Sequence, residues 1–172
     1  MNTYKPKVFV LDVDGVMTTG QFLYTKNGKE MKIFGPDDND GLSLLKPYMD
    51  IIFVSGDKKG FDISKKRIVD DMEYPLELVS TIQRVKWLSE RYILDEVIYM
   101  GDGIFDHYVF KSVGYSIATH DADENAILNA NYVTKRTGGN RAVAEACLHI
   151  LKKFFIPYDP GNQIKRSEEW MI

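Results

Sequence analysis

The sequence is poor in cysteine, with Cys147 alone among 172 residues, so the chain cannot form an internal disulfide. Small secreted domains usually need several disulfides, and this class of scaffold is therefore excluded. The sequence also has no apolar run near the ~20 residues that span a bilayer. Residues 1–7 do not resemble the start of a signal peptide. These absences predict a soluble, cytoplasmic protein without a membrane partner.

Basic charge is not in excess, because 22 lysine and arginine residues face 25 acidic residues and the formal net charge is −3. Nucleic-acid-binding domains usually carry a clustered basic surface, so we expect no nucleic-acid partner. The three histidines, His107, His120 and His149, have no spacing typical of a metal site. Hydrophobic residues make up 44% of the chain, which is enough for the core of one layered domain.

Short runs of β-forming residues recur along the chain, with helical patterns between them. The runs are continuously apolar, which is typical of strands buried on both faces of a parallel sheet. Alternating strands and helices predict an α/β fold with a doubly wound, mostly parallel, Rossmann-like sheet and right-handed crossovers. The predicted strands cover residues 8–11, 51–54, 97–100, 115–118 and 132–133, with 76–79 as a further candidate.

The dipeptide Asn27-Gly28 lies between two segments rich in β-forming residues, and it strongly favours a tight hairpin turn. We therefore expect a β-hairpin insertion over about residues 21–34, directly after the first strand. The acidic run 37–40 is expected to cap the helix that follows it, and a substrate-facing role for Asp40 stays open. The predicted organisation is one core over residues 1–156, without a cap domain, and a C-terminal tail over residues 157–172.

Polar side chains gather where three of the predicted strands end, which is where ligands bind in such sheets. The first strand ends at Asp12 and Asp14, another at Ser55, and a third at Asp102, with Asp106 one helical turn later. Carboxylates without histidine or cysteine neighbours suit Mg²⁺, which accepts substrate phosphate oxygens as further ligands. A carboxylate can also attack phosphorus and form an aspartyl-phosphate. The pattern predicts a phosphoryl-transfer site.

These residues resemble the haloacid dehalogenase superfamily of phosphatases over about residues 8–155. The motif DxDGxxT matches residues 12–18, the motif-two hydroxyl matches Ser55, and the motif GDxxxD matches residues 101–106. The stretch 11–20, the hairpin and residues 39–42 are similar to the capless branch of this superfamily. That branch contains 3-deoxy-D-manno-octulosonate 8-phosphate phosphatases and the C-terminal module of acylneuraminate cytidylyltransferase.

The resemblance implies a Mg²⁺-dependent phosphomonoesterase in carbohydrate biosynthesis. Its small-molecule substrate would be a phosphorylated sugar or sugar acid of the octulosonate or nonulosonate type. By the same resemblance, Asp12 is the nucleophile and a Mg²⁺ ligand, and Asp14 is the acid/base whose backbone carbonyl also binds the metal. Asp102 is then the third protein ligand of the metal, and Asp106 supports the ligands from behind.

Phosphate binding is assigned by resemblance to Ser55 and Gly56, together with a cation from the third motif. The family has a lysine at the start of the helix before the motif-four strand, but no cation stands at the usual spacing. We favour Lys86 for this role, with Arg84 as the second candidate, although arginine is not equivalent to lysine. Asp57 stands where the branch often has arginine, which reverses a charge near the mouth of the site.

Other functions remain open from the sequence. If neither cation reaches the phosphate, the chain would be a weak or inactive module for oligomerisation or regulation. A phosphoacceptor signalling domain is disfavoured, because its acceptor aspartate should end the third strand rather than the first. Members of the capless branch usually form homotetramers in which hairpins build a central barrel and neighbours cover the sites. Arg141 either belongs to a turn or lines the substrate pocket.

Overall fold

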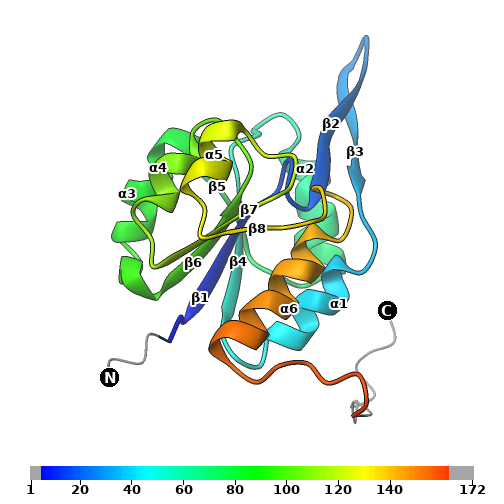
Figure 1. Ribbon diagram of the computed structural model, residues 1–172. Coiled ribbons are helices and arrows are strands. Elements are labelled where there is room, and N and C mark those ends of the chain that lie inside the picture. Colours follow the sequence, from blue (N-terminus) through cyan, green and yellow to red (C-terminus); the bar gives the residue numbers. More distant parts are fainter. Residues whose placement is uncertain (1–4, 163–172) are drawn as a thin grey trace.

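The central feature of the computed structural model, which describes residues 5–162, is a six-stranded parallel sheet with strand order β5–β4–β1–β6–β7–β8 (Figure 1). A separate antiparallel pair, β2–β3, forms the hairpin. The strands are β1 (Val8–Asp12), β2 (Thr18–Thr25), β3 (Gly28–Phe34), β4 (Asp50–Ser55), β5 (Leu76–Leu78), β6 (Val97–Gly101), β7 (Tyr115–Ala118) and β8 (Tyr132–Val133). The α-helices are α1 (Asp38–Leu45), α2 (Phe61–Lys65), α3 (Arg84–Ser89), α4 (Asp106–Phe110), α5 (Glu124–Asn129) and α6 (Ala142–Phe154).

The sheet is covered on both faces, which confirms the doubly wound fold expected from the sequence. Phe9 and Leu11 of β1 belong to a core with α1 and α6, whereas Val8 and Val10 belong to a second core with α3, α4 and α5. Successive side chains of a strand point to opposite faces, so one apolar strand serves two cores. Every predicted strand is present, including the candidate at residues 76–79 as the short β5.

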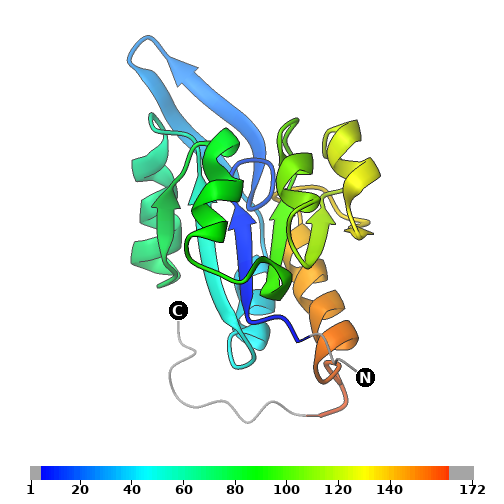
Figure 2. The same ribbon diagram turned by 90° about the vertical axis from the view of Figure 1, so that its left-hand side faces the viewer.

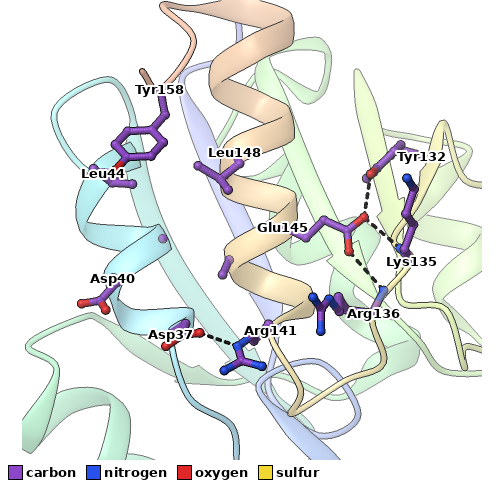
Figure 3. Close-up of a pocket in the computed structure, with 12 residues that line it drawn as sticks. Asp37, Asp40, Leu44, Tyr132, Lys135, Arg136, Arg141, Glu145, Leu148 and Tyr158 are labelled. Atoms are coloured by element: carbon purple, nitrogen blue, oxygen red, sulfur yellow. Dashed lines mark hydrogen bonds and ion pairs between the residues drawn. The ribbon is translucent and has the colours of Figure 1, made fainter. Parts of the chain in front are cut away.

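Helices α1 and α6 pack closely against each other at their N-terminal ends. Gly41 permits their close approach, because a Cβ there would collide with Ala144. The carboxylate of Asp38 accepts a hydrogen bond from the backbone N–H of Ala144 at 2.9 Å, so it caps α6. Asp37 stands at the N-cap of α1 without a side-chain cap and pairs with Arg141 (Figure 3). The predicted capping of α1 by these carboxylates is wrong, because contacts with α6 engage both.

The hairpin β2–β3 rises beyond the edge of the sheet at which β1 ends (Figure 2). Its strands begin three residues earlier than expected, at Thr18, and end as expected at Phe34. Residues 157–162 are irregular, as the sequence predicts, and the rest of the predicted tail lies outside the described residues. None of the helices in the described part of the chain combines the length and the apolar character needed to cross a bilayer.

Candidate active site

The carboxyl ends of three neighbouring strands meet at one edge of the sheet, because β1 pairs in register with both β4 and β6. Asp12 ends β1, Ser55 ends β4, and Asp102 follows the last residue of β6. A Cβ at Gly15 would collide with the carboxylate of Asp102, so this carboxylate lies against the loop after β1. The structure therefore brings together the three segments that the sequence singled out.

The loop after β1 is held in a defined shape by short-range hydrogen bonds. Gly15 has a φ of +87°, a left-handed conformation that a residue with a Cβ rarely adopts. The hydroxyl of Thr18 accepts the backbone N–H groups of Gly15 and Gly20, at 3.3 and 3.2 Å. Asp12 accepts the N–H of Val13 at 2.7 Å, which orients its carboxylate. The threonine and glycine of the first motif thus shape the loop.

Arg84, at the start of α3, binds the carboxylate of Asp12 through two nitrogens, at 2.7 and 3.0 Å. Its side chain is 2% exposed, and the same guanidinium reaches Asp106 at 3.2 Å. Burial disfavours the charge, but Tyr99 and the two carboxylates raise the pKa of Arg84, which therefore stays charged. A bidentate arginine–carboxylate pair is among the stronger interactions available in a buried site.

The structure does not bring Lys86 to this cluster, so the preference for Lys86 over Arg84 is wrong. The Lys86 side chain is 81% exposed and lies 3.8 Å from Glu90, one turn along α3. The helix begins at Arg84 after the short 3-10 turn Thr81–Gln83, so the first residue of the helix, not the third, faces the acidic groups. The rotation of α3 against the sheet therefore decides which cation reaches the acidic groups.

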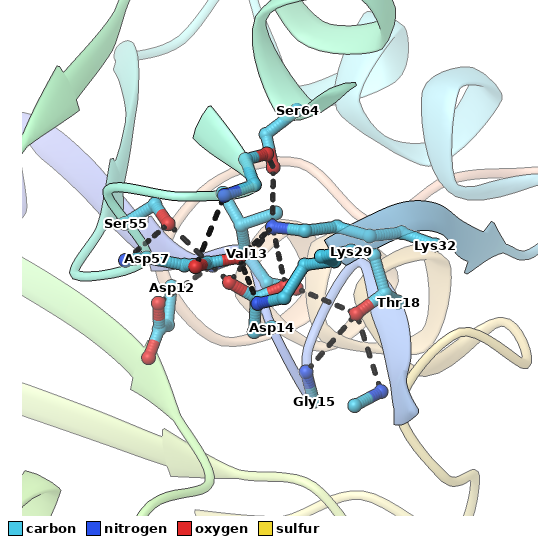
Figure 4. A network of polar contacts seen from close by, with 12 residues as sticks. Asp12, Val13, Asp14, Gly15, Thr18, Lys29, Lys32, Ser55, Asp57 and Ser64 are labelled. Carbon is cyan, nitrogen blue, oxygen red and sulfur yellow. Dashed lines mark hydrogen bonds and ion pairs between the residues drawn. The ribbon is translucent and has the colours of Figure 1, made fainter. Parts of the chain in front are cut away.

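Asp14 is held by the hairpin as well as by the sheet (Figure 4). The ammonium group of Lys32, in β3, lies 2.8 Å from Asp14 and also donates to Ser64 at 2.8 Å. The hydroxyl of Ser55 donates to Asp14 at 3.3 Å. Burial raises the pKa of Asp14 although Lys32 opposes this effect. A carboxyl group with a raised pKa at a phosphoryl-transfer site can donate a proton to a leaving group.

Asp57 lies at the centre of an ion cluster between the hairpin and the loop after β4. It pairs with Lys29 at 2.5 Å and with Lys32 at 3.0 Å, and it accepts the N–H of Gly60 at 3.1 Å. Burial opposes ionisation of Asp57, but the hydrogen bonds from the two lysines outweigh burial and lower its pKa. Lys29 also packs over the ring of Phe22. The acidic residue that departs from the family pattern thus fastens the hairpin.

An extra residue in β3 explains how both lysines reach Asp57. Leu23 pairs with Met31 but the next residue, Tyr24, pairs with Lys29, so Glu30 is inserted into the ladder as a bulge. A bulge breaks the alternation of side chains along a strand. Residues 29 and 32 would otherwise point to opposite faces of the hairpin.

The acidic side chains around Asp102 form a site that fits a divalent cation. Asp12, Asp102 and Asp106 each present an oxygen within 4.8 Å of the other two. Burial, followed by repulsion from Asp12, Asp106 and Asp121, raises the pKa of Asp102 to about 8. Such crowding of carboxylates is relieved when a cation binds between them. All-oxygen ligands of this kind suit Mg²⁺.

Asp106 is fully buried, and each of its two carboxylate oxygens already accepts two hydrogen bonds. One oxygen accepts from Arg84 and from the hydroxyl of Tyr99, at 3.2 and 2.9 Å. The other accepts from the backbone N–H groups of Asp102 and Gly103, at 2.9 and 2.8 Å. This saturation fits a supporting carboxylate better than a direct metal ligand, as the resemblance implies.

A separate hollow of 740 Å³ is lined by residues of both α1 and α6 and by residues near β8 (Figure 3). Arg141 is at its edge and pairs with Asp37, so this arginine faces the hollow rather than the acidic cluster. Glu145 accepts the backbone N–H groups of Lys135 and Arg136, which closes one wall of the hollow. None of the proposed catalytic residues lines this hollow.

Sequence reasoning missed three polar residues of the site, namely Lys29, Lys32 and Tyr99. Tyr99 could have been noticed, because a phenol in a buried strand needs a partner for its hydroxyl. The lysines carried no usable signal, since the bulge at Glu30 cannot be deduced from the spacing alone.

Comparisons with known proteins point to one family. The model of the haloacid dehalogenase-like hydrolases matches residues 80–146. The 3-deoxy-D-manno-octulosonate 8-phosphate phosphatase of Salmonella typhi is 31% identical over 151 residues, which cover 82% of this chain and 77% of that protein. The corresponding protein of Escherichia coli K12 is 30% identical over the same shares of the two chains.

Two solved structures extend the likeness to the fold. The Moraxella catarrhalis phosphatase of the same name, in complex with magnesium, phosphate and the sugar acid, is 27% identical with a TM-score of 0.73, covering 87% of this chain and 88% of that one. The cobalt-bound Haemophilus influenzae phosphatase is 25% identical with a TM-score of 0.75, covering 88% and 91%. The chain therefore belongs to the haloacid dehalogenase-like hydrolases, as a phosphatase of the 3-deoxy-D-manno-octulosonate 8-phosphate phosphatase family.

Proposed function

We propose that the chain hydrolyses the phosphate monoester of a small sugar or sugar acid in two steps. Asp12 attacks phosphorus in line with the ester oxygen, forming an aspartyl-phosphate, while Asp14 gives its proton to the departing alcohol. Asp14 then takes a proton from water, whose oxygen attacks the aspartyl-phosphate and releases inorganic phosphate and free Asp12. The raised pKa of Asp14 supports its role as the acid in the first step.

The observation that carries this proposal is the bidentate ion pair between Arg84 and Asp12, which lies beside the carboxylate of Asp102. Arg84 fixes the direction of the Asp12 carboxylate before the substrate arrives, and its charge is available to the phosphoryl group as negative charge builds up. It thereby takes the place for which the family uses lysine. The hydroxyl of Ser55 and the backbone at Gly56 are proposed to hold the other phosphoryl oxygens.

Mg²⁺ is the proposed cofactor, held by the side chains of Asp12 and Asp102 and by the backbone carbonyl of Asp14. When bound, the ion polarises a phosphoryl oxygen and balances the charge of the carboxylates. The mutual closeness of the carboxylates and the raised pKa of Asp102 support a cation at this position. Asp106 keeps its supporting position because its own oxygens are already saturated.

The substrate class is proposed from the relatives, whose names refer to 3-deoxy-D-manno-octulosonate 8-phosphate. Octulosonate and nonulosonate phosphates are therefore the first substrates to test, in a role in carbohydrate biosynthesis. Asp57 is acidic and is paired with Lys29 and Lys32, so the contacts proposed for the sugar at this position differ from those that an arginine would make.

We further propose a homotetramer in the cytoplasm, assembled through the hairpin. Five apolar side chains of β2 and β3 are between 40% and 63% exposed, which is unusual for a strand pair that faces only water. A shared hairpin interface would cover them: Phe22, Leu23, Tyr24, Met31 and Ile33. The buried free thiol of Cys147 is compatible with a reducing compartment.

The proposal is tested by a panel of octulosonate, nonulosonate, heptose and hexose phosphates, assayed with Mg²⁺ and with EDTA. We expect release of phosphate from at least one member, only with Mg²⁺, and loss of this activity in Asp12→Asn without loss of the folded state by circular dichroism. Equal turnover by Asp12→Asn would refute the nucleophile. Inactivity toward the whole panel, with an intact tetramer, would favour the alternative of an oligomerisation or regulatory module.

A further inference from the structure

Tyr99 is a polar residue in a strand that is buried at every position. It stands in β6 between Ile98 and Met100, and its side chain is completely shielded from solvent. Its hydroxyl accepts a hydrogen bond from Arg84 at 2.5 Å and donates one to Asp106 at 2.9 Å. A phenylalanine would fill the same space, so the hydroxyl itself needs an explanation.

The hydroxyl joins two parts of the site that are far apart in the sequence. On one side, Arg84 binds the carboxylate of Asp12. On the other side, Asp106 accepts the backbone N–H groups of Asp102 and Gly103 and thereby sets the shape of the turn after β6. A continuous chain of hydrogen bonds thus runs from the proposed nucleophile to the turn that carries Asp102.

We propose that Tyr99 is a positioning residue, an inference that rests on the proposed function. Tyr99 holds Arg84 against Asp12, and it holds the turn at Asp102, in the geometry required for phosphoryl transfer. Its side chain is completely buried, and its hydroxyl contacts Arg84 and Asp106. It acts through its two partners, because its single proton is committed to Asp106 and its lone pair to Arg84.

Removal of the hydroxyl changes how the charge of Arg84 is shared. Asp106 loses one of the two donors to its first oxygen, and the guanidinium is the nearest group that can compensate. Arg84 then shifts from Asp12 toward Asp106. In the wild type the Arg84–Asp106 distance of 3.2 Å is the longest of the hydrogen bonds that Arg84 donates to Asp12, Tyr99 and Asp106. The carboxylate of Asp12 loses its two-point grip, and the turn at Asp102 loses part of its support.

Tyr99→Phe is the direct test, and Phe110→Leu is its matched control. Phe110 packs edge-on against the ring of Tyr99, with 6.0 Å between centroids, and is equally part of that core. Both variants are expected to lower the melting temperature. Only Tyr99→Phe is expected to lower kcat and to raise the Mg²⁺ concentration for half-maximal rate, each by about 10-fold or more, with little change in KM.

A second measurement does not depend on turnover. In the metal-free protein, hydrogen exchange at the amides of Asp102 and Gly103 is followed by NMR. These amides donate to Asp106, so Tyr99→Phe should speed their exchange selectively, whereas Phe110→Leu should affect all amides of its core alike. Combining Tyr99→Phe with Arg84→Lys should lower kcat by less than the product of the two single effects, because the hydroxyl acts through Arg84.

The outcomes separate this inference from the proposed function. Unchanged kcat, unchanged Mg²⁺ dependence and unchanged exchange at Asp102 and Gly103 in Tyr99→Phe would overturn the positioning role and leave a packing role. Multiplicative effects in the double variant would also overturn it. If the wild-type protein hydrolyses no substrate of the panel, the proposed function fails, and the exchange measurement still decides whether Tyr99 holds the turn.

Discussion

Arg84 holds both carboxylate oxygens of Asp12 although 72 residues separate the two in the chain. The guanidinium is buried and touches three acceptors, Asp12, Asp106 and Tyr99. A lysine presents a point charge, whereas the planar fork of arginine can bind a carboxylate at two points. In the proposed mechanism Arg84 takes the role of the family's lysine, and the two-point contact with Asp12 uses the geometry of arginine.

Arg84→Lys should keep the fold but weaken the reaction. The ammonium group preserves the charge beside Asp12 and Asp106 yet cannot reproduce the two-point grip, so we expect kcat to fall about 10- to 100-fold. Arg84→Met should also destabilise the protein, by about 3–5 kcal/mol, because it leaves two buried carboxylates without their cation. Rates with Mg²⁺ and denaturant unfolding check both variants.

Lys86→Ala is the matched control for the Arg84 variants, since Lys86 lies on the same helix and its side chain is exposed. Its rate and stability should stay close to those of the wild type. A loss of activity in Lys86→Ala comparable to that in Arg84→Lys would restore Lys86 as the cation of the site.

Asp38→Asn should change how stability depends on pH. Burial raises the pKa of Asp38 from 3.8 to about 6, against the hydrogen bonds from Ala144 and Val143. A raised folded-state pKa means that the neutral form is favoured on folding, so this contribution is present below pH 4 and is lost as the pH rises through 6. The wild type should lose up to about 3 kcal/mol over this window relative to Asp38→Asn.

Urea unfolding at pH 4 and pH 7 measures this difference, with Asp40→Asn as the control on an exposed carboxylate of the same helix. Parallel pH profiles for the wild type and Asp38→Asn would contradict the expected role of Asp38.

Lys32→Met should loosen the hairpin and disturb Asp14. The ammonium group is completely buried between Asp14, Asp57 and Ser64, so its removal takes one donor away from each of them. We expect a loss of about 2–4 kcal/mol in unfolding free energy and slower turnover as the pKa of Asp14 rises further. Lys26→Met, at the exposed tip of the same hairpin, should change neither quantity, and equal effects of the two variants would exclude a specific role for Lys32.

Leu23→Glu should dissociate the proposed tetramer. Its side chain is 45% exposed on the hairpin, and a buried charge at an interface strongly opposes association. Light scattering after size exclusion gives the mass of the assembly. Leu128→Glu serves as the control because Leu128 is 72% exposed on α5, away from the hairpin, and its assembly should match that of the wild type. A wild-type protein that is monomeric at micromolar concentration would contradict the proposal.

The strands and the convergence of their polar ends could be predicted because both depend on local patterns. The run at residues 97–100 is apolar throughout, so it predicts a buried strand, and Asp102 follows it at the edge where ligands bind. The capping role of the acidic run 37–40 failed for the opposite reason. Asp38 has a better partner in α6, which lies about a hundred residues later in the chain.

Hydrophobic periodicity and turn residues act over a few neighbouring positions, so they already indicate the layered α/β fold, the hairpin and the strand ends that carry Asp12, Asp14, Ser55 and Asp102. The tertiary structure alone decided that Arg84 rather than Lys86 meets the acidic cluster, since this depends on the rotation of α3 against the sheet. It also decided the contacts of Lys32, which follow from the bulge in β3 and from the packing of β3 against α2, beside the loop after β1. Side-chain direction at that level is fixed by contacts between distant segments, which no local pattern records.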